Sequence, residues 1–463
     1  MSAKDGLRKG ISIVLFVNII NLVFKLITNF LMPKYLTVDC YADFKYYQLF
    51  IGYLGIMHFG FVDGVYLQYG GKTIDEIPEN QLGKSLAALI SLEAVVTVAV
   101  GAIALLLNNM IIFAVAFAIL PTEAAWFYKY VYQATGEFSK YGRIMNVNTI
   151  LVFILELLLI LCGVQNAYYY IAANTAALLI VWILLERKAR IHYQKQWFGA
   201  KNVVRECKDN IPQGIFVMAG NFASQFLTSM DRWFIRVLMD ATAFAQYSFA
   251  ASIVVFMNVA VTPFSITFYN HFCKHNDTNT VKRIEGAIYL LATGLIALAF
   301  PVKWILEHFI PNYIDATAVI FYLFAAQGFS IIISCIYVNL YKATKTQKSY
   351  SIKMGIMIVI GFLLNAGMYY VMRTKESFAI ATLITTAIWY LMSQADFPQY
   401  IAPAKSQFFL VLEIVVFLYV GITFNSIFGV AIYLACLAIG IAIFMRDEFK
   451  TVISMISLRK RRT

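Results

Sequence analysis

Two apolar blocks follow each other in the chain: residues 84–107 read KSLAALISLEAVVTVAVGAIALLL, and residues 110–133 read MIIFAVAFAILPTEAAWFYKYVYQ. Each has roughly the length that an α-helix needs to cross about 30 Å of hydrocarbon at about 1.5 Å per residue. Only Asn108 and Asn109, which form a turn signal, separate the blocks. Continuous apolar runs exclude the weak alternation of barrel strands, so the blocks predict two membrane-spanning helices.

The same pattern extends along the whole chain of 463 residues, of which 61% are hydrophobic and only 13% are charged. Soluble domains normally carry about a quarter charged residues, so this composition excludes a soluble fold. Breaks at charged and turn-forming residues predict an all-α membrane protein with about fourteen transmembrane helices. The predicted helices span residues 10–32, 44–69, 84–107, 110–133, 143–163, 167–186, 212–238, 243–272, 282–306, 317–341, 350–371, 377–395, 407–423 and 428–446. The first lacks a small-residue cleavage site, so we expect it to be retained.

Basic residues indicate how the helices are oriented. With the N-terminus inside, alternate connections collect nearly all Lys and Arg residues, as the positive-inside rule requires. The connections on the outer side carry only Lys34, Lys45, Lys303, Arg373 and Lys375. The net charge of +12 is therefore mainly a topology signal, and both termini are predicted to be cytoplasmic. The basic C-terminal tail fits anionic lipid headgroups better than nucleic acid, which we do not expect as a partner.

The longest inner connection divides the chain after the sixth predicted helix. We expect an N-terminal lobe at 1–186, a basic cytoplasmic linker at 187–210, a C-terminal lobe at 211–395, a helix pair at 396–446 and a basic cytoplasmic tail at 447–463. The two lobes of six helices show a weak internal repeat. At a constant offset it matches Asn21 with Asn221, Thr28 with Thr228, Phe44 with Phe244 and Tyr47 with Tyr247. Both lobes begin inside, which favours a parallel repeat around a central cavity.

Polar and ionisable side chains recur at helical spacing inside several predicted helices. Such groups are costly in hydrocarbon and normally face a cavity or a partner. They are Asn21, Lys25, Asp63, Glu93, Glu123, Lys129, Glu156, Asn221, Gln225, Asp231, Arg232 and Arg236. The stripes in helices 10–32 and 212–238 each lie on one helix face.

Two interpretations of these residues stay open. In the first, they form hydrogen bonds and ion pairs between helices: Asp231 neutralises Arg232 or Lys25, and Glu93 and Glu156 pair with Lys129. In the second, they line a cavity whose fixed cations suit an anionic substrate. Lys and Arg bind diphosphate through charge-assisted hydrogen bonds that are strong where water is excluded.

Several classes of function lack support in the sequence. No nucleophile–base constellation, metal motif or phosphate-binding glycine loop is present, and the six cysteines have neither metal spacing nor a disulfide pattern. The outer loops are too short for a catalytic domain. We therefore expect no enzyme, no metal and no cofactor. The glycines Gly52, Gly55, Gly60 and Gly64 predict close packing and bending of the second helix.

Four segments carry a resemblance to a known family. They are FKYYQ at 44–48, HFGFVDGVYLQYGG at 58–71, SMDRWFI at 229–235 followed by FAQYSFA at 244–250, and NLYK at 339–342 through QKSY at 347–350. In their order and spacing, over essentially the whole length, the chain resembles the Wzx-type polysaccharide flippases. These belong to the multidrug/oligosaccharidyl-lipid/polysaccharide exporter superfamily. None of the four segments is a catalytic signature.

The resemblance implies a flippase for undecaprenyl-diphosphate-linked oligosaccharide units. It would act in the bacterial inner membrane during O-antigen or other surface polysaccharide assembly, by alternating access of two lobes. Membrane lipids and other assembly proteins would be its partners. The candidates for binding diphosphate and sugar are Lys25, Arg232, Arg236, Lys129, Asn21, Asn221 and Gln225. Asp63, Glu123 and Asp231 are the candidates for coupling transport to an ion gradient.

Three alternatives remain beside this function. A multidrug or metabolite exporter of the same superfamily would favour cationic substrates, for which the carboxyls Asp63, Glu93 and Glu156 are suited. A lipid II flippase would share the fold and the substrate chemistry. A membrane polymerase, ligase or glycosyltransferase would need a large outer loop or a paired-carboxylate motif, and the sequence has neither.

Overall fold

The computed structural model describes residues 3–189, 195–272 and 278–450. Within these residues every regular element is helical, so the predicted all-α fold class is confirmed. Part of the predicted linker, residues 190–194, and most of the predicted tail, residues 451–463, lie outside the described residues.

Helices follow one another along the chain with short connections between them. The first are α1 (Ala3–Tyr35), α2 (Val38–Ile51), α3 (Phe61–Tyr69), α4 (Glu79–Leu106), α5 (Met110–Ala134), α6 (Phe138–Leu161), α7 (Ala167–Ala189) and α8 (Ala200–Leu238). They are followed by α9 (Ala241–Phe272), α10 (Thr278–Ile296), α11 (Ala299–Phe309), α12 (Thr317–Ile332), α13 (Val338–Ala343), α14 (Gln347–Met372), α15 (Lys375–Asp396), α16 (Ala404–Thr423) and α17 (Ser426–Phe444). Short turns are the 3-10 helices η1 (Leu54–Ile56), η2 (Ile74–Glu76), η3 (Lys195–Phe198), η4 (Pro311–Ala316) and η6 (Pro398–Tyr400), and the π-helical turn η5 (Ile333–Tyr337).

The helices coincide with the predicted transmembrane ranges. Among the described residues, 12 helical segments are long and apolar enough to cross a membrane. A further span is the bent pair of Val38–Ile56 and Phe61–Tyr69, whose axes differ by 55°. The range 212–238 lies in α8, which is long enough to span but more polar, because side chains such as Asn221 and Gln225 interrupt its apolar residues.

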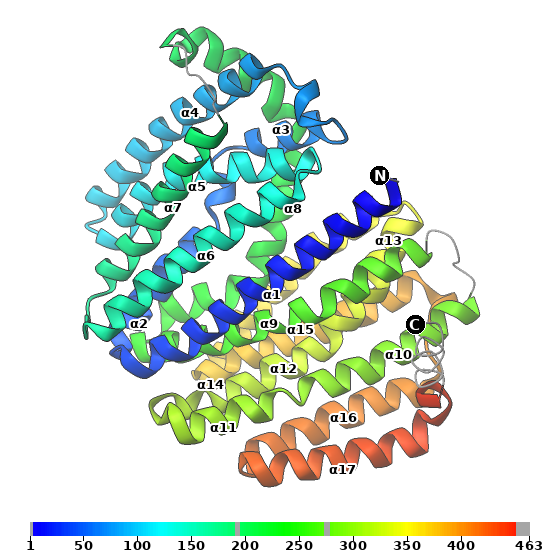
Figure 1. Cartoon of the computed structure of the whole chain (residues 1–463). Coiled ribbons are helices and arrows are strands. Elements are labelled where there is room, and N and C mark those ends of the chain that lie inside the picture. The colour runs from blue at the N-terminus through cyan, green and yellow to red at the C-terminus, as the bar shows by residue number, and fades with distance from the viewer. Residues whose placement is uncertain (1–2, 190–194, 273–277, 451–463) are drawn as a thin grey trace. The chain divides into compact units, whose positions relative to one another are not determined.

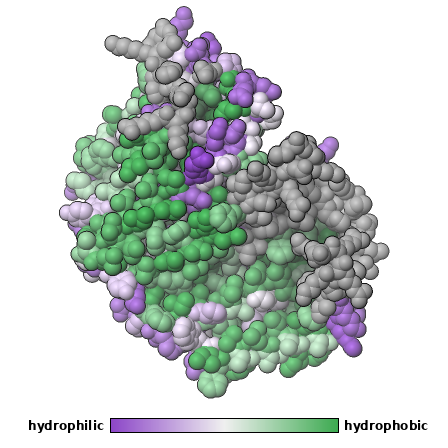
Figure 2. Space-filling view, viewed as in Figure 1, coloured by the Kyte–Doolittle hydropathy of each residue, from purple (hydrophilic) through white to green (hydrophobic). Residues whose placement is uncertain are grey.

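The surface of these helices is apolar where they face outward. On the face shown in Figure 2, apolar side chains cover broad stretches of the described helices. Large side chains stand out from them, such as Leu106 at 86% exposure and Tyr370 at 79%. Such a surface is stable in lipid rather than in water, because lipid has no hydrophobic penalty for it. The protein is therefore a multi-pass membrane protein.

The chain forms two compact units, Met1–Ser229 and Met230–Thr463, and each is described by itself. The boundary falls inside α8, whose residues up to Ser229 belong to unit 1. The lobe boundaries expected from the sequence stay a prediction. In unit 1, α5 packs against α4 and α7, and α1 packs against α6, as Figure 1 illustrates. In unit 2, α12 is the central helix and packs against α9, α10, α15 and α16.

The span formed by α2 and α3 is broken between them. Phe59 and Gly60 both have positive φ, at 51° and 86°, and Gly60 is the N-cap of α3 in a left-handed conformation that suits glycine. The chain then enters α3 in direct backbone contact with α8. A Cβ on Gly64 would lie 2.1 Å from the Asn210 carbonyl oxygen, and one on Gly214 would lie 2.0 Å from the Gly60 carbonyl oxygen. The predicted close packing and bending is confirmed at Gly60 and Gly64.

Candidate functional site

The candidate site in unit 1 is built on one face of α5. Glu123, Trp126, Lys129 and Tyr130 recur there at intervals of three and four residues, which place side chains on the same side of a helix. The Lys129 ammonium lies 5.3 Å from the centre of the Trp126 ring and 5.4 Å from that of Tyr130. Cation–π attraction to the two rings therefore holds a half-buried charge in place.

A second cation lies close to this face. Lys25 of α1 is exposed, and its charge repels that of Lys129. Within the described part of unit 1 neither lysine forms an ion pair. The charge of Glu123 attracts Lys129 at longer range. Two neighbouring ammonium groups without a paired carboxylate create a positive potential that an anion would neutralise. The cation pair of Lys25 and Lys129 is therefore suited to an anionic group.

Three carboxyls form a group of interacting charges in unit 1. Glu93 of α4 and Glu123 of α5 are fully buried, and Asp63 of α3 is 5% exposed. The charge of Glu123 interacts with those of Glu93, Asp63 and Lys129. In the described residues neither Glu93 nor Glu123 accepts a hydrogen bond. Buried carboxylates without partners are costly, so this group is suited to take up a proton or a cation.

The break between α2 and α3 positions Asp63. His58 Nδ1 accepts a hydrogen bond from the Gly60 amide at 3.1 Å, and His58 Nε2 lies 3.8 Å from Asp63 Oδ2. Because Nδ1 is an acceptor, the proton of the neutral ring is on Nε2 and points toward the carboxyl. Among the described residues no group of three or more His, Cys, Asp or Glu side chains is arranged to hold a metal ion.

The other predicted residues of unit 1 lie around this centre. Asn21 is one helical turn from Lys25 and is buried, and its Oδ1 accepts no hydrogen bond from the described residues. On α8, Asn221 is exposed and Gln225 is half-buried, with its Nε2 close to Gly52 at the start of the break. Gln225 therefore has a polar atom near the break, and Asn21 is a neighbour of Lys25 on α1.

Glu156 has a different partner from the one considered for it. Its Oε1 accepts a hydrogen bond from Asn174 Nδ2 of α7 at 2.9 Å, and its charge is attracted by Lys45. Lys45 in turn donates to Asn29 Oδ1 at 3.0 Å. This second polar group holds α1, α2, α6 and α7 together. For Glu156 the interhelical interpretation therefore holds, with Asn174 in place of Lys129.

In unit 2, three predicted residues lie together on the last part of α8. Asp231 Oδ1 accepts a hydrogen bond from the Arg232 amide at 2.7 Å, and Oδ2 accepts one from the Tyr247 hydroxyl at 2.5 Å. The guanidinium of Arg232 is half-buried, and its Nε has no partner among the described residues. Arg236 lies over the Phe244 ring at 5.6 Å. Asp231 is thus held by α8 and α9, and Arg232 keeps a donor free.

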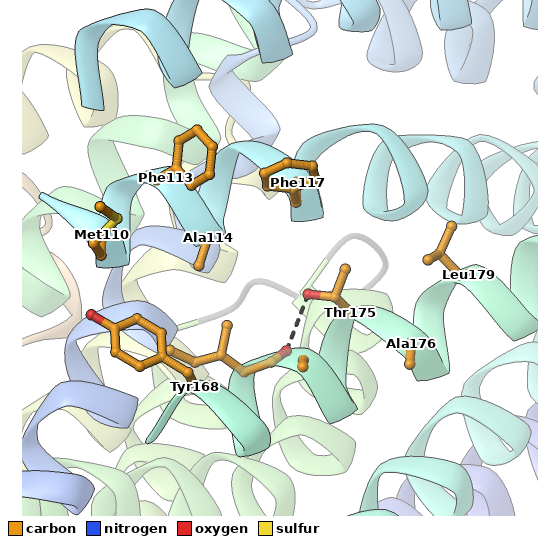
Figure 3. Close-up of a pocket in the computed structure, with 10 residues that line it drawn as sticks. Met110, Phe113, Ala114, Phe117, Tyr168, Thr175, Ala176 and Leu179 are labelled. Carbon is orange, nitrogen blue, oxygen red and sulfur yellow. Dashed lines mark hydrogen bonds between the residues drawn. The ribbon is translucent and has the colours of Figure 1, made fainter. Parts of the chain in front are cut away.

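Unit 1 also contains an apolar pocket of about 550 Å³ between α5 and α7. Figure 3 shows Phe113, Phe117 and Tyr168 beside it, and a hydrogen bond of 3.1 Å from Thr175 Oγ1 to the Ile171 carbonyl at its wall. The remaining lining residues are Met110, Ala114, Ala172, Ala176 and Leu179. No predicted site residue lines this pocket, and its apolar wall offers nothing to a diphosphate.

Two buried carboxyls were not predicted from the sequence. Glu206, in the predicted linker, is 1% exposed and accepts hydrogen bonds from Ser85 Oγ at 2.7 Å and Gln81 Nε2 at 3.1 Å, so it fixes the start of α8 to α4. Glu285 of α10 is fully buried in unit 2 among tyrosines. Both lie close to basic residues in sequence, where a carboxyl is normally solvated. The partners of Glu206 come from α4, and those of Glu285 are Tyr289 of its own helix and Tyr337 of η5.

Comparisons with known proteins give matches to solved structures alone. No protein-family model matches the chain, and no curated protein matches it in sequence. The matching solved structures include two transporters of the MATE type, one of them a mutant of VcmN from Vibrio cholerae. That mutant has a TM-score of 0.41, 14% identity and coverage of 86% of this chain and 98% of its own. The other, in the straight conformation, has a TM-score of 0.40, 11% identity and coverage of 89% and 96%.

The particular likeness is to the lipid II flippase MurJ in an inward closed conformation. Its TM-score is 0.70, with 15% identity and coverage of 95% of this chain and 99% of that one. The chain therefore has the fold of a lipid II flippase. This fold confirms the architecture that the resemblance to flippases of the exporter superfamily led us to expect.

Proposed function

We propose that the chain is a flippase that moves undecaprenyl-diphosphate-linked oligosaccharide units across the bacterial inner membrane for surface polysaccharide assembly. Movements of the two lobes would open the substrate site first to one side of the membrane and then to the other. Both termini would lie in the cytoplasm. The substrate, membrane lipids and other polysaccharide assembly proteins would be its partners.

The cation pair of Lys25 and Lys129 carries this proposal. A diphosphate supplies several charged acceptor oxygens, and each hydrogen bond to an ammonium in a water-poor site is about twice as strong as a neutral one. Trp126 and Tyr130, which already hold Lys129, offer aromatic faces of the kind that sugars contact.

The remaining predicted residues have supporting roles in the proposal. Arg232 and Arg236 would bind the diphosphate from the C-terminal lobe, and Asn21, Asn221 and Gln225 would donate or accept hydrogen bonds with phosphate or sugar. The carboxyls Asp63, Glu123 and Asp231 would couple the cycle to an ion gradient.

A MATE-like exporter of lipophilic cations is the competing function. It is favoured by one observation, the pair Glu93 and Glu123, whose buried carboxyls have no hydrogen-bond partner in the described residues. For an exporter of cations these carboxyls would hold the substrate, and the lysines would hinder its entry. The two functions therefore predict opposite effects of removing the lysines.

Binding of undecaprenyl diphosphate to the full chain in nanodiscs tests the proposal. We expect Lys25→Ala and Lys129→Ala each to weaken binding about 10- to 100-fold, the effect of losing one hydrogen bond to a charged group. Lys25→Arg should retain most of the affinity. Lys34→Ala is the matched control, because Lys34 is on the same helix and lies over the Tyr35 ring, away from the pair. Equal affinity in all variants contradicts the proposal.

Surface polysaccharide provides the cellular test. Lys25→Ala and Arg232→Ala should each abolish its export while the protein inserts normally, as shown by its abundance in the membrane fraction. Tighter binding of a lipophilic cation to Lys25→Ala, with loss of that binding in Glu123→Gln, would instead support the exporter.

A further inference from the structure

A buried carboxyl in unit 2 lies outside the site described above. Glu285 is in the second turn of α10 and is fully buried. Its Oε1 accepts a hydrogen bond from the Tyr289 hydroxyl at 3.1 Å and another from the Tyr337 hydroxyl at 2.9 Å. Its Oε2 has no hydrogen-bond partner in the described residues. The two oxygens of one carboxyl are therefore in different states, one saturated and one without a partner.

The hydrogen bonds around Glu285 all run in one direction. Each tyrosine hydroxyl has a single proton, and the hydroxyl of Tyr289 uses it to donate a hydrogen bond to Glu285 Oε1. In the contact between the Tyr289 and Tyr390 hydroxyls, Tyr390 is then the donor. Gln394 Nε2 donates to the Tyr390 hydroxyl at 2.7 Å. A chain of donors thus runs from α15 to Glu285 Oε1, and none of them can turn to Oε2 without breaking it.

No ion pair in the described residues neutralises Glu285. Lys282, one turn earlier on α10, is half-buried and attracts it at longer range. The side chain of Glu448 lies against Gly286, and its Oε1 is 3.8 Å from Lys405 Nζ of α16. From η5 and α15 the titratable groups facing Glu285 are the tyrosines. At the end of α15, Asp396 is already paired with Lys353 Nζ at 2.5 Å.

One tyrosine of this group lies in an unusual turn. Tyr337 is the last residue of the π-helical turn η5, which interrupts the helical segment from α12 to α13. The side chain of Asn339 donates to the Cys335 carbonyl at 2.9 Å and to the Ser265 carbonyl of α9 at 2.8 Å. Single π-turns are rare and recur at functional positions in helices. The bond from Tyr337 to Glu285 therefore links the carboxyl to a local irregularity of the central helical segment of unit 2.

We propose that Glu285 is a proton-binding site of this protein and that Tyr337 connects it to the π-helical turn. A hydronium ion transfers a proton to Oε2 and leaves as water, which converts the carboxylate to a neutral acid. The hydrogen bond from Tyr337 is strong to the carboxylate and weaker to the acid. Proton uptake thus loosens the hold on η5, and release tightens it. Only the use of this proton to drive transport rests on the proposed flippase function.

Infrared difference spectra of the full-length protein in liposomes, recorded between two pH values without any glycan, test proton binding directly. The wild type should show bands of protonated carboxyls, and Glu285→Gln should lack the one component that belongs to Glu285. Glu413→Gln is the matched control, because Glu413 is another buried carboxyl of unit 2, on α16, outside the tyrosine chain. It should retain the Glu285 band.

Tyr337→Phe keeps the proposal testable should Glu285→Gln fail to fold. It removes one of two donors to the ionised carboxyl, so the band should persist to a pH about one unit higher, a tenfold change in proton affinity. A spectrum of Glu285→Gln like that of the wild type, or a pH midpoint unchanged in Tyr337→Phe, overturns the proposal. A band that disappears on adding Na⁺ at constant pH also overturns it, in favour of a metal cation. Failure of undecaprenyl diphosphate to bind leaves these spectra unaffected and contradicts only the flippase function.

Discussion

Single lysines in this membrane protein have different roles that composition alone does not separate. The ammonium of Lys129 lies over two aromatic rings and forms no ion pair in the described residues. Lys303 of α11, by contrast, is 7% exposed. Its ammonium donates to the Gly421 carbonyl at 2.8 Å and also to the Phe424 carbonyl. These two carbonyls belong to the end of α16 and the residue after it, where no helical partner exists for them. Lys303 therefore closes a helix end, although in sequence it looks like an outer-loop charge.

Replacing Lys303 tests this structural role. We expect Lys303→Met to lower the free energy of unfolding by about 1–3 kcal/mol, because two buried carbonyls lose a charged donor. Thermal unfolding of the purified protein in detergent measures the change, with Lys34→Met as the control at an exposed position. An equal melting temperature of the two variants would contradict the assignment.

The sequence predicted the burial of some carboxyls and not of others. Glu123 and Lys129 lie in the middle of a long apolar run, so their cost in hydrocarbon is visible from the sequence, and helical spacing places them on one face. Glu285 lies beside Lys282 near a predicted helix end, where a charge is unremarkable. Besides Tyr289 on its own helix, it is bonded by Tyr337, which is more than fifty residues away and which no local pattern reveals.

At the scale of helices, hydropathy predicted the positions of the spans and the glycines predicted the bend between α2 and α3. The π-helical turn η5 has no such signal, because its residues, ISCIY, also suit an α-helix. The crossing of α3 and α8 was predicted in part from the sequence. Gly60 and Gly64 indicate close packing, but only the structure identifies Asn210 and Gly214 as the residues they contact.

The crossing makes a prediction about alanine substitutions. Gly64→Ala and Gly214→Ala should each destabilise the protein by a few kcal/mol, because the new Cβ meets a backbone carbonyl that cannot move aside by rotation of a side chain. Gly355→Ala of α14 is the matched control, since a Cβ there meets nothing within 4 Å. It should be neutral or stabilising by up to about 1 kcal/mol, the helix propensity difference. Denaturation in detergent at fixed lipid content measures all three.

At the scale of the whole molecule, the alternation of basic residues predicts the topology. Continuous apolar length and the positive-inside rule together predict the number of spans and the location of both termini, and an error of one helix would scramble the alternation. The structure supplies helices at every predicted range, including the polar α8.

Reporter fusions test the topology. A reporter active only in the cytoplasm should be active after residue 450 and in the 345–348 connection, and inactive after Asn108 or near Arg373. The reason is that Lys and Arg gather in the first two places and are sparse in the second two. Activity at Asn108 with none after residue 450 would invert the orientation and place the basic connections outside.

The contact of α3 with α8 also has an evolutionary consequence. Because neither Gly64 nor Gly214 leaves room for a single additional carbon, a change at one position cannot be compensated by a smaller residue at the other. The two positions should therefore be inherited together as glycine across homologous chains. The apolar residues on the lipid-facing surface, such as Leu106, should drift freely by contrast. A pair of glycines at this separation would then identify distant relatives whose overall identity has fallen too low to align.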